Sequence, residues 1–146
     1  MLRSIILSAA LFGGGCEPEE SSTLAKRECE LLLAAEEFSA SATLARGNSL
    51  YSFAIPLLNR LRTETDYWKG CSIDSALCEL TGVDVPYGCS VPEEDWSYWA
   101  QRRLVYWEAW LASREGRDFL NGKAAPSNRK FWGDDDLVLF LQSDAN

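Results

Sequence analysis

The chain of 146 residues contains no histidine and only one methionine. Without histidine, the Ser-His and Cys-His catalytic pairs and histidine-ligated metal sites are excluded. Positive charge is also scarce, because 14 lysines and arginines oppose 22 aspartates and glutamates, which gives a net charge of −8. An acidic surface repels phosphate backbones, so we expect no nucleic-acid partner. We also expect no metal, no cofactor and no enzymatic activity.

No apolar run reaches the roughly 20 residues that cross a bilayer as a helix. The N-terminus has a basic Arg3, an apolar stretch over residues 4–12 and three glycines before Cys16, which is the order of parts in a secretory signal peptide. Gly14, Gly15 and Cys16 resemble the lipobox of bacterial lipoproteins, although Gly13 stands where leucine is usual. This resemblance implies that Cys16 receives lipid and becomes the first residue of the mature chain.

The sequence then divides into a signal peptide at 1–15, a lipidated cysteine with an acidic tether at 16–22, and one helical domain at 23–146. An ordinary cleaved secretory peptide and an uncleaved apolar N-terminus remain as alternatives. A lipoprotein of this kind lies in the bacterial cell envelope, held to a membrane by its lipid, on the periplasmic face or the cell surface. Glu17 follows the cysteine; aspartate there is associated with inner-membrane retention, so the outer membrane is favoured.

The five cysteines are an odd number, which would leave a spare thiol in an oxidising compartment. Lipidation of Cys16 removes that spare thiol and leaves four cysteines for two disulfides. Three pairings are possible, of which we favour Cys29 with Cys78 and Cys71 with Cys89; four reduced core thiols are the alternative. The chain has no C-x-x-C spacing, which argues against zinc.

Apolar residues recur at helical spacing in several stretches, so the sequence predicts an all-α domain of three to four main helices with a disulfide-bonded, irregular middle. The middle runs from Gly70 to Val91 and holds three cysteines, Gly82, Pro86 and Gly88. The expected helices cover residues 23–45, 52–68, a short piece at 74–80, 92–114 as the longest, and 137–142. The last stretch is equally compatible with a buried edge strand.

The longest predicted helix carries four tryptophans and two arginines within an arc of about 80°. Aromatic residues on one helix face are usually core, but a charge within an apolar arc needs a carboxylate partner or an opening to solvent. If the stripe is open, its aromatic faces and arginines form a candidate binding face for a protein or glycan. Its residues are Trp96, Trp99, Arg103, Trp107, Trp110 and Arg114.

Residues 110–115, Trp-Leu-Ala-Ser-Arg-Glu, are similar to the W-L-x-x-R-[DE] element of the LprI-type periplasmic lysozyme inhibitors. The cysteine that usually follows closely in that family is replaced here by Gly116-Arg117-Asp118. The resemblance covers this hexapeptide alone and implies an inhibitor type of function.

Together these features predict an envelope-anchored binding protein of the inhibitor, immunity or exclusion type. Its acidic surface suits a basic partner protein, such as a cell-wall hydrolase or a toxin. A structural envelope lipoprotein or assembly subunit without a ligand is one alternative. A glycan-binding or glycan-cleaving wall protein is another, in which Glu94 and Glu108 would be the carboxylates that carry out cleavage.

Overall fold

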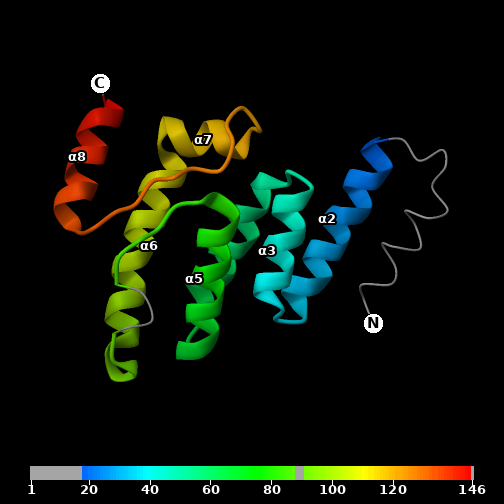
Figure 1. Ribbon diagram of the computed structural model, residues 1–146. Helices are drawn as coiled ribbons and strands as arrows, with labels where there is room; N and C mark the ends of the chain where they lie inside the picture. Colours follow the sequence, from blue (N-terminus) through cyan, green and yellow to red (C-terminus); the bar gives the residue numbers. More distant parts are fainter. Residues whose placement is uncertain (1–17, 88–90, 146) are drawn as a thin grey trace.

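The computed structural model describes residues 18–87 and 91–145 (Figure 1). Within them the protein is all-helical, as the sequence predicts, with seven α-helices and no strand. None of these helices is long and apolar enough to cross a membrane. The helices are α2 (Pro18–Ala34), α3 (Phe38–Gly47), α4 (Ala54–Thr63), α5 (Tyr67–Thr81), α6 (Trp96–Ala112), α7 (Arg114–Leu120) and α8 (Asp134–Ala145), with 3₁₀ turns at Tyr51–Phe53 and Glu93–Asp95.

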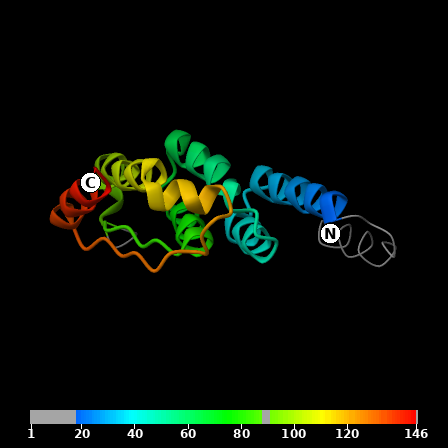
Figure 2. The ribbon, with the colours of Figure 1, turned by 90° about the horizontal axis from the view of Figure 1, so that it is seen from above.

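The helices form a row that begins with α2 and ends with α8 (Figures 1 and 2). Helix α3 packs against both α2 and α5, α4 packs against α5, and α6 packs against α7. Residues 82–87, which follow α5, and the segment that precedes α8 are not helical and run along the same side of the row (Figure 2). The N-terminal helices and α8 are therefore at opposite ends of the protein.

The first predicted helix is two helices, because the chain reverses at residues 35–37. Glu36 has a φ of 61°, a left-handed conformation that ends a helix, and the Glu37 amide donates to the Leu32 carbonyl across the turn at 2.9 Å. Helix α2 begins at Pro18, so residues 18–22 of the predicted tether are helical. The predicted signal peptide and Cys16 lie outside the described residues.

The irregular middle is also shorter than predicted, because α5 continues to Thr81. Asp66 caps this helix by accepting a hydrogen bond from the Lys69 amide at 2.9 Å, and this cap separates α5 from α4. Gly70 does not break the helix. A Cβ at Gly70 would lie 2.0 Å from the Trp96 ring, so the glycine leaves room for that ring against α5.

The C-terminal elements follow the sequence pattern more closely. Helix α6 covers most of the predicted longest helix, and Ser113 caps the next one by accepting from the Gly116 amide at 3.1 Å. Ser90 and Glu93 have the spacing of a capping box for α6, but Ser90 lies outside the described residues. Of the two alternatives for the last apolar stretch, the structure has the helix, α8, which starts at three aspartates as expected for a helix N-terminus.

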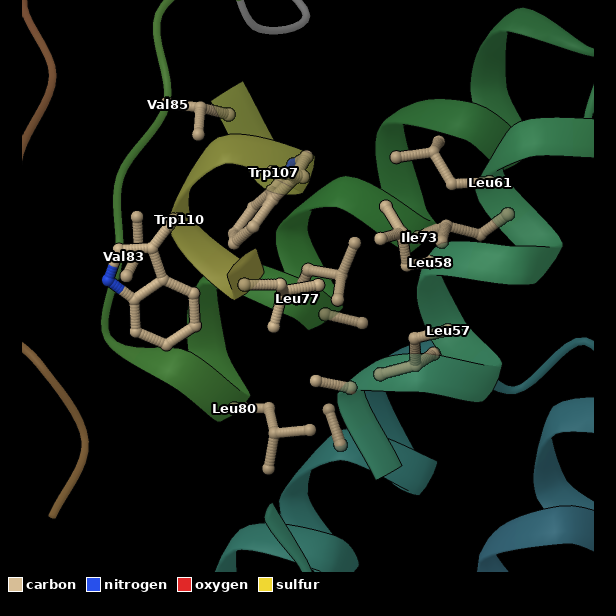
Figure 3. Close-up of a cluster of buried hydrophobic side chains, with 14 of the residues drawn as sticks. Leu57, Leu58, Leu61, Ile73, Leu77, Leu80, Val83, Val85, Trp107 and Trp110 are labelled. Atoms are coloured by element: carbon tan, nitrogen blue, oxygen red, sulfur yellow. The ribbon is translucent and has the colours of Figure 1, made fainter. Parts of the chain in front are cut away.

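The main core lies where α6 faces α4 and α5 (Figure 3). Trp107 and Trp110 of α6 have no exposed surface and point towards leucines and an isoleucine of the other two helices. A smaller cluster forms beside it from Tyr67, Cys71 and Trp96. The other side chains of the main core labelled in Figure 3 are Leu57, Leu58, Leu61, Ile73, Leu77, Leu80, Val83 and Val85.

Residues 127–131 are held beside residues 81–85 by backbone hydrogen bonds. The Ser127 amide donates to the Thr81 carbonyl at 2.7 Å, and Asp84 forms an isolated parallel bridge with Lys130. Gly82 makes the close approach possible, because it has a φ of 74° and a Cβ there would lie 1.9 Å from the Ser127 oxygen. This contact fixes the segment that leads into α8.

We therefore expect Gly82→Ala to destabilise the protein far more than Gly122→Ala. Both glycines have positive φ, and each substitution introduces strain of about 1–2 kcal/mol. A Cβ at Gly122 meets nothing within 4 Å, so only Gly82→Ala adds a backbone clash, which raises its cost to roughly 3 kcal/mol or more. Urea denaturation measures both, and equal losses would show that the packing of Ser127 on Gly82 is not tight.

Candidate functional site

The predicted binding face is largely inside the protein. Trp96, Arg103, Trp107 and Trp110 are each at most 5 % exposed. Trp99 is half-buried and Arg114 is exposed. The prediction that the whole stripe is a binding face is therefore corrected. Four of its six residues belong to the core and have almost no surface to offer a ligand.

The carboxylate that Arg103 requires is Asp74 of α5. The two side chains, 1 % and 8 % exposed, form a buried ion pair, and Asp74 Oδ1 also accepts from Trp107 Nε1 at 2.9 Å. The guanidinium lies 5.4 Å from the centre of the Trp96 ring. Its Nε and Nη1 have no hydrogen-bond partner among the described residues. Burial lowers the pKa of Arg103 to about 10, which still leaves it protonated at neutral pH.

The W-L-x-x-R-[DE] hexapeptide forms the corner between α6 and α7. Trp110 Nε1 donates to Glu115 Oε2 at 2.5 Å, and the same oxygen accepts from Arg129 Nε at 2.7 Å. Arg129 in turn lies over the Phe140 ring, 4.5 Å from its centre. Glu115 thus connects α6, the segment before α8, and α8 itself. No sequence pattern predicts that Glu115 pairs with Arg129.

The preferred pairing of Cys29 with Cys78 is wrong. Both are free thiols, and α3 packs between the helices that carry them, which keeps them apart. Burial raises the pKa of each thiol to about 11, so both are largely protonated at neutral pH and poor nucleophiles. Cys71 lies in the small cluster with Tyr67 and Trp96, and Cys89 lies outside the described residues.

Glu94 and Glu108 are not arranged for glycan cleavage. Glu94 precedes α6 and Glu108 lies 14 residues further along the chain, a separation of about 21 Å along a helix. Paired catalytic carboxylates stand roughly 5–10 Å apart. Glu108 instead pairs with Arg62 at 3.2 Å on the surface.

Asp134 attaches the start of α8 to α6. It pairs with Arg102 and accepts a hydrogen bond from the Tyr106 hydroxyl. The Tyr106 bond, followed by the Arg102 contacts, lowers the pKa of Asp134 below its usual value. Burial, followed by the Asp134 bond, raises the pKa of Tyr106. At the other end of α8, Asp144 accepts from the Arg114 amide at 2.9 Å.

A groove runs along α8, opposite the side that carries Val138. Two hollows of about 290 and 230 Å³ share Arg129, Phe140 and Ser143, and they therefore adjoin. We call them together the α8 groove. One wall is α8, and the other comes from the first residues of α7 and from residues 129–131. Leu139, which is 63 % exposed, provides an apolar surface within the groove.

The α8 groove has an excess of acidic groups. Among its charged residues, Arg129 pairs with Glu115, and Lys130 pairs with Asp84 outside the groove at 3.5 Å. The remaining charges are Asp118, Asp136 and Asp144 against Arg114. None of these three carboxylates forms an ion pair within the part of the chain that the structure describes. The groove therefore combines an exposed leucine with net negative charge.

A third hollow, of about 400 Å³, lies beside the groove at residues 132–136 and adds Asp135 to the acidic surface. The described residues contain no group of three metal-ligating side chains. No sequence pattern indicated the groove, because the residues that line it are spread over residues 114–144. No family model, curated protein or solved structure matches the chain.

The buried ion pair generates a direct prediction. Asp74→Asn leaves the Arg103 charge buried without a counterion, and we expect a loss of about 3–5 kcal/mol in the free energy of unfolding. Arg103→Met removes that charge, so in the Asp74→Asn background it should restore much of the loss. Arg62→Gln, which breaks the exposed pair with Glu108, should cost less than about 1 kcal/mol. Urea denaturation of the double-mutant cycle measures the coupling, and simply additive losses would contradict it.

Proposed function

We propose that the protein is an envelope-anchored binding protein that engages a basic partner protein outside the cytoplasm. The observation that carries the proposal is the α8 groove, in which the exposed Leu139 lies among carboxylates without ion-pair partners. A buried apolar contact surrounded by complementary charge is the usual composition of a protein interface. The charge speeds encounter with a basic partner, and the apolar contact contributes to affinity.

The N-terminus supports the location. Residues 1–16 have the signal and lipobox pattern, and removal of residues 1–15 takes away Arg3 alone among charged residues, which changes the net charge from −8 to −9. A more acidic mature chain does not bind anionic lipid by itself. The proposal therefore assigns membrane attachment to lipid on Cys16, with the outer membrane favoured.

We further propose one disulfide, between Cys71 and Cys89. Cys71 packs in the small cluster with Tyr67 and Trp96, and Val91 packs against that cluster. The Tyr67 hydroxyl donates to the Val91 carbonyl at 3.1 Å, which holds the chain two residues after Cys89 close to Cys71. Such a bridge would tie the segment before α6 to α5.

Within this proposal, an inhibitor, immunity or exclusion role is the version that the hexapeptide resemblance favours. In the structure, the hydrogen bond from Trp110 to Glu115 of that hexapeptide holds the corner between α6 and α7. Glu115 also lines one wall of the groove. An envelope protein without a ligand is the second candidate, in which Asp136 and Asp144 would serve only as acceptors for the amides of Trp132 and Arg114. The proposal assigns binding rather than catalysis.

Mass spectrometry of the protein isolated from membranes tests the anchor and the bridge. We expect a mature chain that begins at a lipid-modified Cys16. In the denatured protein without reductant, Cys29 and Cys78 should be alkylated, whereas Cys71 and Cys89 should react only after reduction. An unmodified Cys16 would remove the lipid anchor from the proposal, and four thiols reactive before reduction would remove the disulfide.

Capture of proteins from envelope extracts at low salt tests the binding role. The variant Asp136→Asn/Asp144→Asn lowers the acidity of the groove and keeps both hydrogen-bond acceptors. It should weaken binding of a basic partner by roughly tenfold. Glu30→Gln/Glu37→Gln makes the same charge change at the opposite end of the row, where both glutamates are exposed, and should have less than about a twofold effect. Equal losses, or no specific partner, would contradict the proposal.

A further inference from the structure

One wall of the α8 groove has an open backbone edge. The Asp84 amide donates to the Arg129 carbonyl at 2.9 Å, and the Phe131 amide donates to the Asp84 carbonyl at 2.9 Å. These bonds use the backbone edge of residues 129–131 that faces Asp84. Figure 1 shows the segment that leads into α8 passing beside the segment that follows α5.

Backbone groups of successive residues in an extended segment point to opposite edges. The amide and carbonyl of Lys130 therefore point away from Asp84, towards the edge on the other side. Neither group has a backbone hydrogen bond among the described residues. An extended segment with such an edge is a template for pairing with another chain.

We infer that, provided the proposed function holds, an extended segment of the partner protein binds in the α8 groove as an added strand on the Lys130 edge. Its backbone pairs with the amide and carbonyl of Lys130. This mode of recognition takes affinity from backbone hydrogen bonds and specificity from alternate side chains. The hydrogen bonds with Asp84 fix the extended course of residues 129–131, so the paired stretch is about three residues long.

The lining of the groove specifies the chemistry of that segment. Leu139 offers an apolar contact, and Asp118, Asp136 and Asp144 offer negative charge without ion-pair partners. Side chains of a strand alternate between two faces. The segment that fits therefore alternates apolar residues with lysine or arginine. A second copy of this chain fits poorly, because its net charge is also strongly negative.

Two labelled peptides of the same composition test this inference. One alternates lysine and leucine strictly, and the other places the same residues at helical spacing, so that only the pattern differs. We expect the alternating peptide to bind the full chain roughly tenfold more tightly, measured by fluorescence polarisation at low salt. On binding, hydrogen exchange at the Lys130 amide should slow. Equal affinities, or an unchanged Lys130 amide, would overturn strand addition.

Two variants of α8 provide a matched control. Leu139→Lys places a positive charge in the groove, whereas Val138→Lys makes the same change at a residue that is 52 % exposed and does not line the groove. Both side chains are exposed, so both variants should fold, which circular dichroism checks. Leu139→Lys should weaken binding of the alternating peptide roughly tenfold, and Val138→Lys by less than about twofold. Equal effects would overturn the assignment to the groove.

These outcomes separate the inference from the proposed function. If the helical peptide binds better, or if sedimentation shows that the chain pairs with itself through α8, strand addition is wrong. The envelope partner can still be captured in either case and still be lost from the Asp136→Asn/Asp144→Asn variant. If no envelope partner is captured but the alternating peptide binds as expected, the groove recognises extended basic segments and the proposed function fails.

Discussion

The buried ion pair between Asp74 and Arg103 is the contact on which the arrangement of the other elements depends. It joins α5 to α6 inside the protein, where both side chains are nearly free of solvent. Trp107 adds a hydrogen bond to the same carboxylate. Helix α6 in turn holds α7 through the corner at Ser113 and α8 through Arg102 and Tyr106. A shift of α6 would therefore move both walls of the α8 groove.

The ion pair also explains how α6 adopts one rotation about its axis. Its tryptophans form a broad apolar stripe, and burial of apolar area alone is non-directional. A buried guanidinium restricts the choice, because any rotation that separates Arg103 from Asp74 leaves two buried charges without partners. The ion pair therefore selects one orientation of α6 about its axis and also contributes to stability. The Trp96 ring, which packs over Gly70, is placed by the same rotation.

Sequence patterns predicted features that depend on one helix at a time. The all-α class, the long helix with the tryptophan stripe, and the requirement of Arg103 for a carboxylate all follow from periodicity and charge. The chain reversal at Glu36 depends on the positive φ of this glutamate. A glutamate in a sequence does not indicate such a conformation, so the reversal could not be predicted. The regular course of α5 depends on Trp96 filling the space over Gly70, a contact 26 residues apart in sequence. The Cys29–Cys78 pairing failed because α3 lies between the two helices, and that order of helices is a tertiary property.

The groove could not be predicted from sequence for the same reason, since its walls are held together by contacts between distant residues, which include the ring contact of Phe131 with Phe140. Glu115 holds Arg129, and Asp134 holds Arg102 and Tyr106. The pKa of Asp134 is lower in the folded protein than its usual value. Its contacts are therefore complete above the ordinary pKa of a carboxyl group and are lost as the pH falls through the lowered value. The position of α8, and with it the shape of the groove, thus depends on the ionised form of Asp134, which is the form present near neutral pH.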